Sequence, residues 1–254
     1  MKLFFSILFV FALALTLSAQ TTTANDEKRR VTEQAHVPSQ PVAMSSELND
    51  VLNRMDRSAA QFRSAQADFV WDQYEKVVDV HDKQSGKIYF QRKGRNDIQM
   101  MAHITEPANA QKFALYQNDK VRLYEPRMDQ VTEYNTSKNK AEFESFLVLG
   151  FGGSGHDLLN SFDVRYAGSE QVDGVKAAKL ELTPKNQKAR GVFDKITLWI
   201  DPARGVSVRQ KFDEPQSGNY RDAMYSNIRL NQNIPGDTFK LKTTSNTKTV
   251  RPQG

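Results

Sequence analysis

Hydrophobic positions near the start of the chain recur every three or four residues. This spacing covers residues 48 to 62 and places the apolar side chains on one face of an α-helix. Ser45 or Ser46 can cap the first turn, and Glu47 suits the positive end of the helix dipole. We therefore predict a helix with an apolar face made of Leu48, Val51, Leu52, Met55, Ala59 and Phe62.

After this helix the hydrophobic period becomes two, which is typical of strands that bury one face. Turn residues separate the alternating runs at hairpin spacing. A helical pattern broken by glycines interrupts them between about 140 and 161. We predict strands near 67–72, 87–91, 98–104, 112–117, 120–124, 130–134, 162–167, 175–183, 194–200, 206–212 and 220–230, with a last short one at 238–241.

Many short strands joined by hairpins indicate an antiparallel sandwich or barrel. With about eleven strands, we expect a large curved sheet wrapped around the N-terminal helix. Barrels well above about eight strands tend to enclose a cavity that side chains do not fill. Since each lies on the apolar side of an alternating strand, the predicted cavity residues are Phe69, Trp71, Ile88, Phe90, Met100 and Leu198. An ordinary filled core is the alternative.

The first residues have the pattern of a secretory signal peptide. A positive start, Met1-Lys2, precedes an apolar run at 3–17 and the small residue Ala19. The run is shorter than the roughly 20 residues of a membrane span, although an uncleaved anchor is the alternative. We assign residues 1–19 to a signal peptide cleaved near 19–20, 20–44 to a disordered tether, 45–245 to the folded domain and 246–254 to a tail.

The composition excludes several kinds of site. The chain has no cysteine, so disulfides, thiolate metal sites, a cysteine nucleophile and a lipid-modified cysteine are all excluded. The net charge is +5, but the charges are scattered and export argues against nucleic acid as a partner. The four histidines lack metal-ligand spacing, and no hydrolase motif is present. We expect no catalytic residue, metal or cofactor, with an enzyme of unusual type as a remote alternative.

A glycine-rich segment at 150–155 matches the G-x-G-x-x-G spacing of dinucleotide-binding loops. That function requires a preceding strand and a parallel βαβ unit. Here the preceding residues 143–149 have a helical pattern, and the strands that follow are joined by hairpins. We therefore predict a lid hinge at Gly150, Gly152, Gly153 and Gly155. The apolar residues around it suit a segment that covers a cavity: Leu147, Val148, Leu149 and Phe151.

Residues 47–241 resemble the LolA-like outer-membrane lipoprotein carriers in four motifs. Residues 64–69 are similar to the family's A-x-F motif, and 86–92 (GKIYFQR) resemble its G-x-[LI]-[WY]-[VF]-x-R strand. Residues 105–107 together with 118–126 resemble the T-x-P … D-G-K-x-x-x-[FY]-x-P stretch, and 237–241 resemble the closing x-x-F-x-[FL]. Two features depart from the family: Lys93 replaces a usual proline, and the glycine-rich segment is not typical of the best-known carriers.

The resemblance implies a mainly β fold, a half-open antiparallel β-barrel of about eleven strands with an N-terminal helix and short lid helices. In the family, an arginine of the second strand latches the lid in the closed, empty state, and Arg92 occupies that position. A surface arginine on an edge strand is the alternative for Arg92.

The function that the resemblance implies is a periplasmic carrier that shields the acyl chains of lipoproteins, or another lipid, between two membranes. An inner-membrane donor complex and an outer-membrane acceptor are the implied partners. We expect a monomer that uses no cofactor. The alternative is a periplasmic regulatory domain of the same fold that senses a lipid or lipoprotein and reports it.

Overall fold

The computed structural model describes residues 44–94 and 97–252. The assigned signal peptide and residues 20–43 of the assigned tether lie outside the described residues. The helices are α2 (Ser46–Gln61), α3 (Lys140–Leu147), α4 (Leu158–Ser161) and α5 (Gln187–Arg190). The strands are β1 (Ser64–Glu75), β2 (Val80–Gly94), β3 (Asp97–Glu106), β4 (Lys112–Gln117), β5 (Lys120–Glu125), β6 (Gln130–Asn135), β7 (Phe162–Val172), β8 (Val175–Pro184), β9 (Lys195–Asp201), β10 (Val206–Asp213), β11 (Tyr220–Leu230) and β12 (Lys248–Val250).

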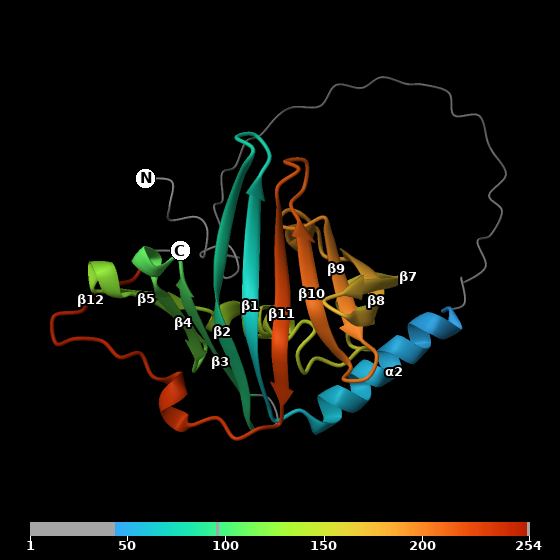
Figure 1. Cartoon of the computed structure of the whole chain (residues 1–254), viewed down its shortest axis with the longest axis horizontal. Coiled ribbons are helices and arrows are strands. Elements are labelled where there is room, and N and C mark those ends of the chain that lie inside the picture. The colour runs from blue at the N-terminus through green and yellow to red at the C-terminus, as the bar shows by residue number, and fades with distance from the viewer. Residues whose placement is uncertain (1–43, 95–96, 253–254) are drawn as a thin grey trace.

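The described strands form one open sheet of twelve (Figure 1). Their order is β12-β6-β5-β4-β3-β2-β1-β11-β10-β9-β8-β7, and every neighbouring pair is antiparallel except β12 with β6. The pairing of β1 with β11 joins two meanders, β1–β6 and β7–β11, at the middle of the sheet. The predicted mainly β, half-open architecture is confirmed, and β12 adds one strand within the segment assigned to the tail.

The short strand predicted at 238–241 is wrong. Residues Gly236–Phe239 form a 3₁₀ turn that follows Pro235. Its Phe239 is buried with Ile234 in a small apolar cluster on the outer face of the sheet, together with Met101 of β3. The apolar side chains of this segment therefore pack onto the outer face of the sheet, and its backbone does not pair with a strand.

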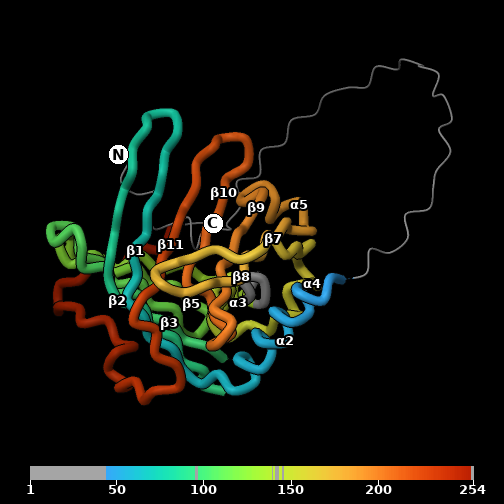
Figure 2. Tube along the Cα trace, turned by 45° about the vertical axis from the view of Figure 1, so that its right-hand side comes forward, coloured from blue at the N-terminus to red at the C-terminus, as the bar shows by residue number. Residues whose placement is uncertain are grey.

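Helix α2 covers the inner face of the half-sheet that holds β7–β10 (Figure 2). The Ser45 side chain accepts a hydrogen bond from the amide of Leu48 at 3.2 Å and so caps the helix. The predicted apolar face is confirmed at its first three turns, where Leu48, Val51, Leu52 and Met55 are buried. They pack in one cluster with the inner-face residues Leu180, Leu182, Ile196, Leu198 and Ile200.

Residues 140–161, which we call the lid segment, cover the inner face of the other half-sheet and also reach the cluster under α2, where Leu149 and Leu158 are buried. The lid segment consists of α3, a glycine-rich turn and α4. A second apolar cluster lies beneath it on β1–β5, and Phe143, Leu147 and Val148 of the lid segment pack against this cluster. The molecule thus has one curved sheet with two different covers on its inner face.

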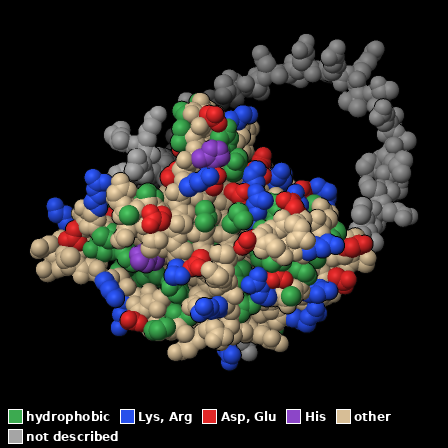
Figure 3. Space-filling model, in the orientation of Figure 1, with side chains coloured by type: hydrophobic (Ala, Val, Ile, Leu, Met, Phe, Trp, Pro, Cys, Tyr) green, Lys and Arg blue, Asp and Glu red, His purple; other side chains and the backbone are tan. Residues whose placement is uncertain are grey.

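The face of the sheet shown in Figure 3 carries lysines and arginines interspersed with aspartates and glutamates. The charges there do not separate into patches of one sign. Within residues 44–94 and 97–252, no helix has both the length and the apolar character to cross a membrane.

Candidate functional site

The structure brings five of the six predicted cavity residues together. Phe69, Ile88, Phe90 and Met100 are 2–5% exposed and belong to the cluster on the inner face of β1–β5. Trp71 is partly buried at the same cluster and stacks on Phe69, with ring centroids 4.2 Å apart. The sixth residue, Leu198, is fully buried in the separate cluster beneath α2. The candidate site is therefore the half of the inner face that lies under the lid segment.

Among the described side chains of the lid segment, Phe151 is the one that is fully buried in this site. It is 2% exposed. Its ring stacks on Phe90 with centroids 5.6 Å apart and meets Tyr225 edge-on at 4.8 Å. Aromatic pairs in these geometries stabilise a contact beyond the area that they bury. The lid segment therefore fills the apolar inner face with its own side chains.

Arg92 reaches from β2 to the lid segment. Its Nη2 atom donates a hydrogen bond to the carbonyl oxygen of Gly152 at 3.1 Å. Its guanidinium also lies 5.8 Å from the ring centroid of Phe62, within the range of a cation–π contact. The side chain is half-buried at the edge of the inner-face cluster. This geometry is compatible with a latch.

A second contact to the lid segment, missed by the sequence reasoning, comes from the opposite side of Phe151. Gln210 Nε2 of β10 donates to the carbonyl oxygen of Leu149 at 2.5 Å. The hydroxyl of Tyr225 on β11 donates to Gln210 Oε1 at 3.1 Å. The backbone amide of Ser207 donates to the Gly150 carbonyl at 2.8 Å. The signal in the sequence was an amide two positions before Phe212 in β10, on the same face of the strand as this apolar residue.

The glycine-rich turn is tied to α2 as well. Asp56 of the helix accepts hydrogen bonds from Ser154 Oγ at 2.6 Å and from the His156 amide at 3.1 Å. The imidazole Nδ1 of His156 bonds to the other carboxylate oxygen. Burial raises the pKa of Asp56, but the hydrogen bonds from Ser154 and His156 outweigh it and leave the pKa below its usual value. The turn is therefore held from α2, β2 and β10.

The predicted hinge glycines lie where the turn passes closest to its neighbours. Gly150 has φ +78°, and a Cβ there would come within 2.5 Å of the Ser207 side chain. A Cβ on Gly155 would lie 2.4 Å from the carbonyl oxygen of Leu52 in α2. Gly152 faces the Phe62 ring in the same way, and Gly153 lies beside Val148. The glycines allow the close approach, and their role as a hinge stays a prediction.

A half-buried carboxyl links α3 to the inner face. Tyr116 of β4 is 1% exposed and donates its hydroxyl to Glu144 Oε1 at 2.9 Å. Lys140 Nζ is 3.9 Å from the same carboxylate. Burial raises the pKa of Glu144 above its usual value, although the Tyr116 and Lys140 contacts oppose that shift. Glu144 is therefore a titratable group of the lid segment.

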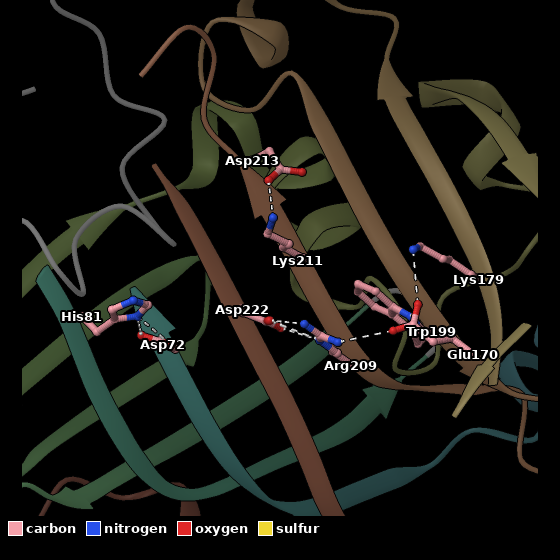
Figure 4. Close-up of polar contacts among 9 residues, drawn as sticks. All are labelled: Asp72, His81, Glu170, Lys179, Trp199, Arg209, Lys211, Asp213 and Asp222. Carbon is pink, nitrogen blue, oxygen red and sulfur yellow. Dashed lines mark hydrogen bonds and ion pairs between the residues drawn. The ribbon is translucent and has the colours of Figure 1, made fainter. Parts of the chain in front are cut away.

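The outer face has a different chemistry. A hollow of about 460 Å³ is lined mostly by polar and charged side chains, including Asp68, Lys87 and Arg229, and does not suit an apolar ligand. Nearby, Figure 4 shows Arg209 between two carboxylates. It bonds to Asp222 at 2.5 Å, and lies 3.8 Å from Glu170.

These carboxylates are therefore compensated by a cation. Arg209 also lies over the ring of Trp199, 4.4 Å from its centroid, and Trp199 Nε1 donates to Glu170 at 3.0 Å. An arrangement of this kind stabilises a surface, and it does not poise one carboxyl as an acid and another as a base. In the described part of the chain, no group of three or more His, Cys, Asp or Glu residues has the geometry to hold a metal ion.

The close packing of Gly155 against α2 predicts the effect of adding one methyl group. In Gly155→Ala the new Cβ would meet the backbone of Leu52, so the turn must move away from the helix. We expect a loss of about 1–3 kcal/mol in the free energy of unfolding, measured in urea, as for other overpacked positions. Gly236→Ala is the matched control, because a Cβ there has no neighbour within 4 Å. Equal effects of the two substitutions would contradict the packing role.

The raised pKa of Glu144 predicts a pH dependence of the lid segment. The closed structure favours the protonated carboxyl, so its stabilising contribution is complete below the ordinary pKa of 4.5 and is lost as the pH rises through the raised value. We expect amide-exchange protection of residues 143–151, corrected for intrinsic rates, to fall over that interval. Glu144→Gln, which keeps an acceptor for Tyr116, should remove the change. An unaltered pH profile in this variant would show that another group titrates.

Comparison with known proteins gives a family and a fold. A family model described as "Uncharacterized protein" matches residues 96–250, which is more than half of the chain. No curated protein matches the sequence significantly. Among solved structures, an uncharacterized conserved protein from Thermus thermophilus superposes with a TM-score of 0.53 at 13% identity, over 82% of this chain and 100% of that one.

Two further solved structures superpose on this chain. MucB of Pseudomonas aeruginosa superposes with a TM-score of 0.51 at 14% identity, over 78% of this chain and 63% of MucB. The LolA superfamily protein NE2245 from Nitrosomonas europaea superposes more loosely, with a TM-score of 0.37 at 15% identity, over 76% of this chain and 97% of that one. At such identities the structural likeness concerns the fold alone. The chain belongs to the family of the model that matches residues 96–250, and its fold, an open and mainly antiparallel sheet of twelve strands with helices on its inner face, resembles those of the Thermus protein and MucB.

Proposed function

We propose that this protein is a periplasmic carrier that shields lipoprotein acyl chains in its barrel during transfer toward the outer membrane, and that it is not an enzyme. The observation that carries the proposal is the inner face of β1–β5. It is a continuous apolar surface, and a separate segment of the chain covers it. That cover is attached by polar contacts at Gly152, Leu149, Gly150, Glu144, Ser154 and His156.

The energetic need for such a carrier follows from the hydrophobic effect. Each buried CH₂ group contributes about 0.8 kcal/mol, so an acyl chain of ~15 methylenes resists passage through water by roughly 10 kcal/mol or more. An apolar surface that is itself protected from water removes this barrier without any chemistry. Carrying the chain therefore requires a cavity and a lid, and no catalytic group.

The lid segment can act as an internal substitute for the cargo. Phe151, Leu147 and Val148 occupy the inner face in the closed structure. An acyl chain would displace these side chains and bury the same surface, so the apolar burial provided by the cargo largely offsets the burial that the lid provided. Exchange of this kind makes loading and release reversible, because the free energy difference between the closed and loaded states stays small.

Arg92 would bias this exchange toward the closed state. A guanidinium carries several donors and no acceptor, so it is suited to holding backbone carbonyls such as that of Gly152. The hydrogen bond exists only when the lid is closed. It therefore stabilises the empty form and favours release of cargo to an acceptor.

Replacing Arg92 by leucine tests the latch. Arg92→Leu removes the donor to Gly152 and adds apolar surface beside Phe62, so we expect tighter binding and slower release of an acyl-chain probe, by roughly tenfold for the loss of one charged hydrogen bond. Arg92→Lys should lie between, because a point charge only partly replaces the planar group. Stopped-flow fluorescence of a bound fluorescent fatty-acid analogue gives both rates.

The matched control for this substitution is Arg229→Leu. Arg229 is exposed on β11, at the hollow of the outer face and away from the lid segment. The Arg229→Leu substitution should leave binding and release of the acyl-chain probe unchanged. If Arg92→Leu behaves like this control while its fold stays intact, Arg92 is a structural surface residue and not a latch.

The location follows from the first twenty residues and belongs to the same proposal. The signal-peptide pattern supports export and cleavage near 19–20, which N-terminal sequencing of the protein from a periplasmic extract would test. Because the chain has no cysteine, its stability does not depend on disulfides and is therefore independent of the oxidising conditions of the periplasm.

Mass spectrometry of material that co-purifies with the mature protein tests the function itself. A carrier should bring acylated lipoprotein or lipid in amounts that fall when an excess of the free fatty-acid analogue is added. The sensing domain considered as an alternative would instead bring a stable protein partner, whether or not it also brings lipid. Recovery of neither lipid nor acylated protein would count against the carrier function.

A further inference from the structure

Gln210 has both ends of its amide fixed inside the protein. The side chain is 5% exposed on the inner face of β10, and Tyr225, which orients it, is 9% exposed. Its Nε2 atom faces the Leu149 carbonyl, and its Oε1 atom faces the Tyr225 hydroxyl. The reversed orientation would place two acceptor oxygens against each other at Leu149, so the amide can present only its donor to the lid segment.

This donor loses its acceptor when the lid segment moves away. The same movement separates Arg92 from Gly152 and the amide of Ser207 from Gly150. A buried donor such as Gln210 Nε2 that is left without an acceptor in an apolar surrounding destabilises a state strongly, and a pure hydrocarbon offers nothing to replace the Leu149 carbonyl. A ligand that carries a carbonyl oxygen at the start of its apolar chain would satisfy this donor.

The two side-chain donors lie on either side of Phe151. Gln210 contacts the lid at Leu149 and Arg92 contacts it at Gly152, three positions further along the chain. Phe151 lies between these two contacts and inserts into the apolar cluster. Displacement of Phe151 by an apolar chain thus brings the head of that chain next to donors that have just been released.

We propose that Gln210, oriented by Tyr225, recognises the acyl carbonyl of the cargo, so that the open site selects ester- or amide-linked acyl chains over hydrocarbon chains of equal length. This inference rests on the carrier function proposed above and names the chemistry of its ligand. Gln210 has two successive acceptors: the Leu149 carbonyl in the closed state and the carbonyl of the cargo in the loaded state. Lipopeptides and phospholipids both carry such a carbonyl where the acyl chain joins the head group, and either class could supply it.

A pair of competitors that differ only at the carbonyl tests the proposal. The fluorescent fatty-acid analogue is displaced from the mature protein either by 1-palmitoylglycerol, an ester, or by 1-hexadecylglycerol, its ether counterpart. We expect the ester to compete about tenfold more strongly, the size of one hydrogen bond to a buried donor. A dipalmitoylated lipopeptide and a lysophosphatidylglycerol, tested in the same way, identify the source of the acyl chain. Tighter competition by either one than by the ether supports recognition of the acyl carbonyl.

Two variants assign the preference to Gln210. Gln210→Leu keeps a similar volume without a donor, so the ester-to-ether ratio should fall to about one while binding of the ether is retained. Tyr225→Phe removes only the hydroxyl that orients the amide and should reduce the ratio partly, and it serves if the first variant fails to fold. Gln99→Leu is the matched control, because Gln99 is a buried glutamine hydrogen-bonded to Gln91 and Gln117, away from the lid. Its ratio should equal that of the wild type.

The outcomes separate this inference from the carrier function. If the wild type binds the fluorescent analogue but ester and ether compete equally, the carrier function stands and carbonyl recognition is overturned. A preference for the ester that survives in both Gln210→Leu and Tyr225→Phe also overturns the assignment to Gln210. If the analogue does not bind the wild type or Arg92→Leu, the carrier function fails and this inference fails with it.

Discussion

The inner face of the curved sheet must be removed from water, and the strands cannot do this alone because the sheet does not close on itself. Its edges are β12 and β7, so the apolar side chains of both meanders face a common concave space. Helix α2 and the lid segment are the covers that this surface requires. The position of every functional side chain considered above depends on how these two covers are attached.

The two covers are attached by different forces. Under α2 the contact is almost wholly apolar, with Leu52 and Met55 buried among inner-face aliphatic residues, and removal of the helix would expose all of them. The lid segment also buries Phe151, but its backbone is held by separate hydrogen bonds from Arg92, Gln210 and Ser207. A ligand that is apolar along its chain and polar at its head can replace both kinds of contact. The inner face of β1–β5 is therefore the part suited to exchange, although Leu149 and Leu158 of the lid segment pack into the core under α2, so that opening the lid also uncovers part of that core.

Backbone carbonyls have an unusual part in this arrangement. The lid residues that receive the hydrogen bonds are Leu149, Gly150 and Gly152, and each offers a main-chain oxygen. The glycines make this possible, since a Cβ at Gly150 would occupy the place of the Ser207 and Gln210 side chains. What the barrel recognises in its own lid is therefore a row of carbonyl oxygens beside an aromatic ring, and an acyl ester presents a similar combination of a carbonyl oxygen and an apolar group.

The sequence by itself determined the elements and the faces that they bury. Helical spacing at 48–62 and alternation in the strands are local properties, because a side chain in a helix or strand has its direction set by the backbone. The segment at 238–241 was misread for the same reason: its apolar residues alternate, but they pack onto the outer face of a sheet formed by distant residues. The tertiary structure alone decided that β1 pairs with β11, that Leu198 lies under α2 and apart from Phe90, and that Gln210 meets Leu149. Those contacts join residues far apart in the chain. Hydrophobic periodicity shows which side of a helix or strand is buried, but it does not show which other element covers that side.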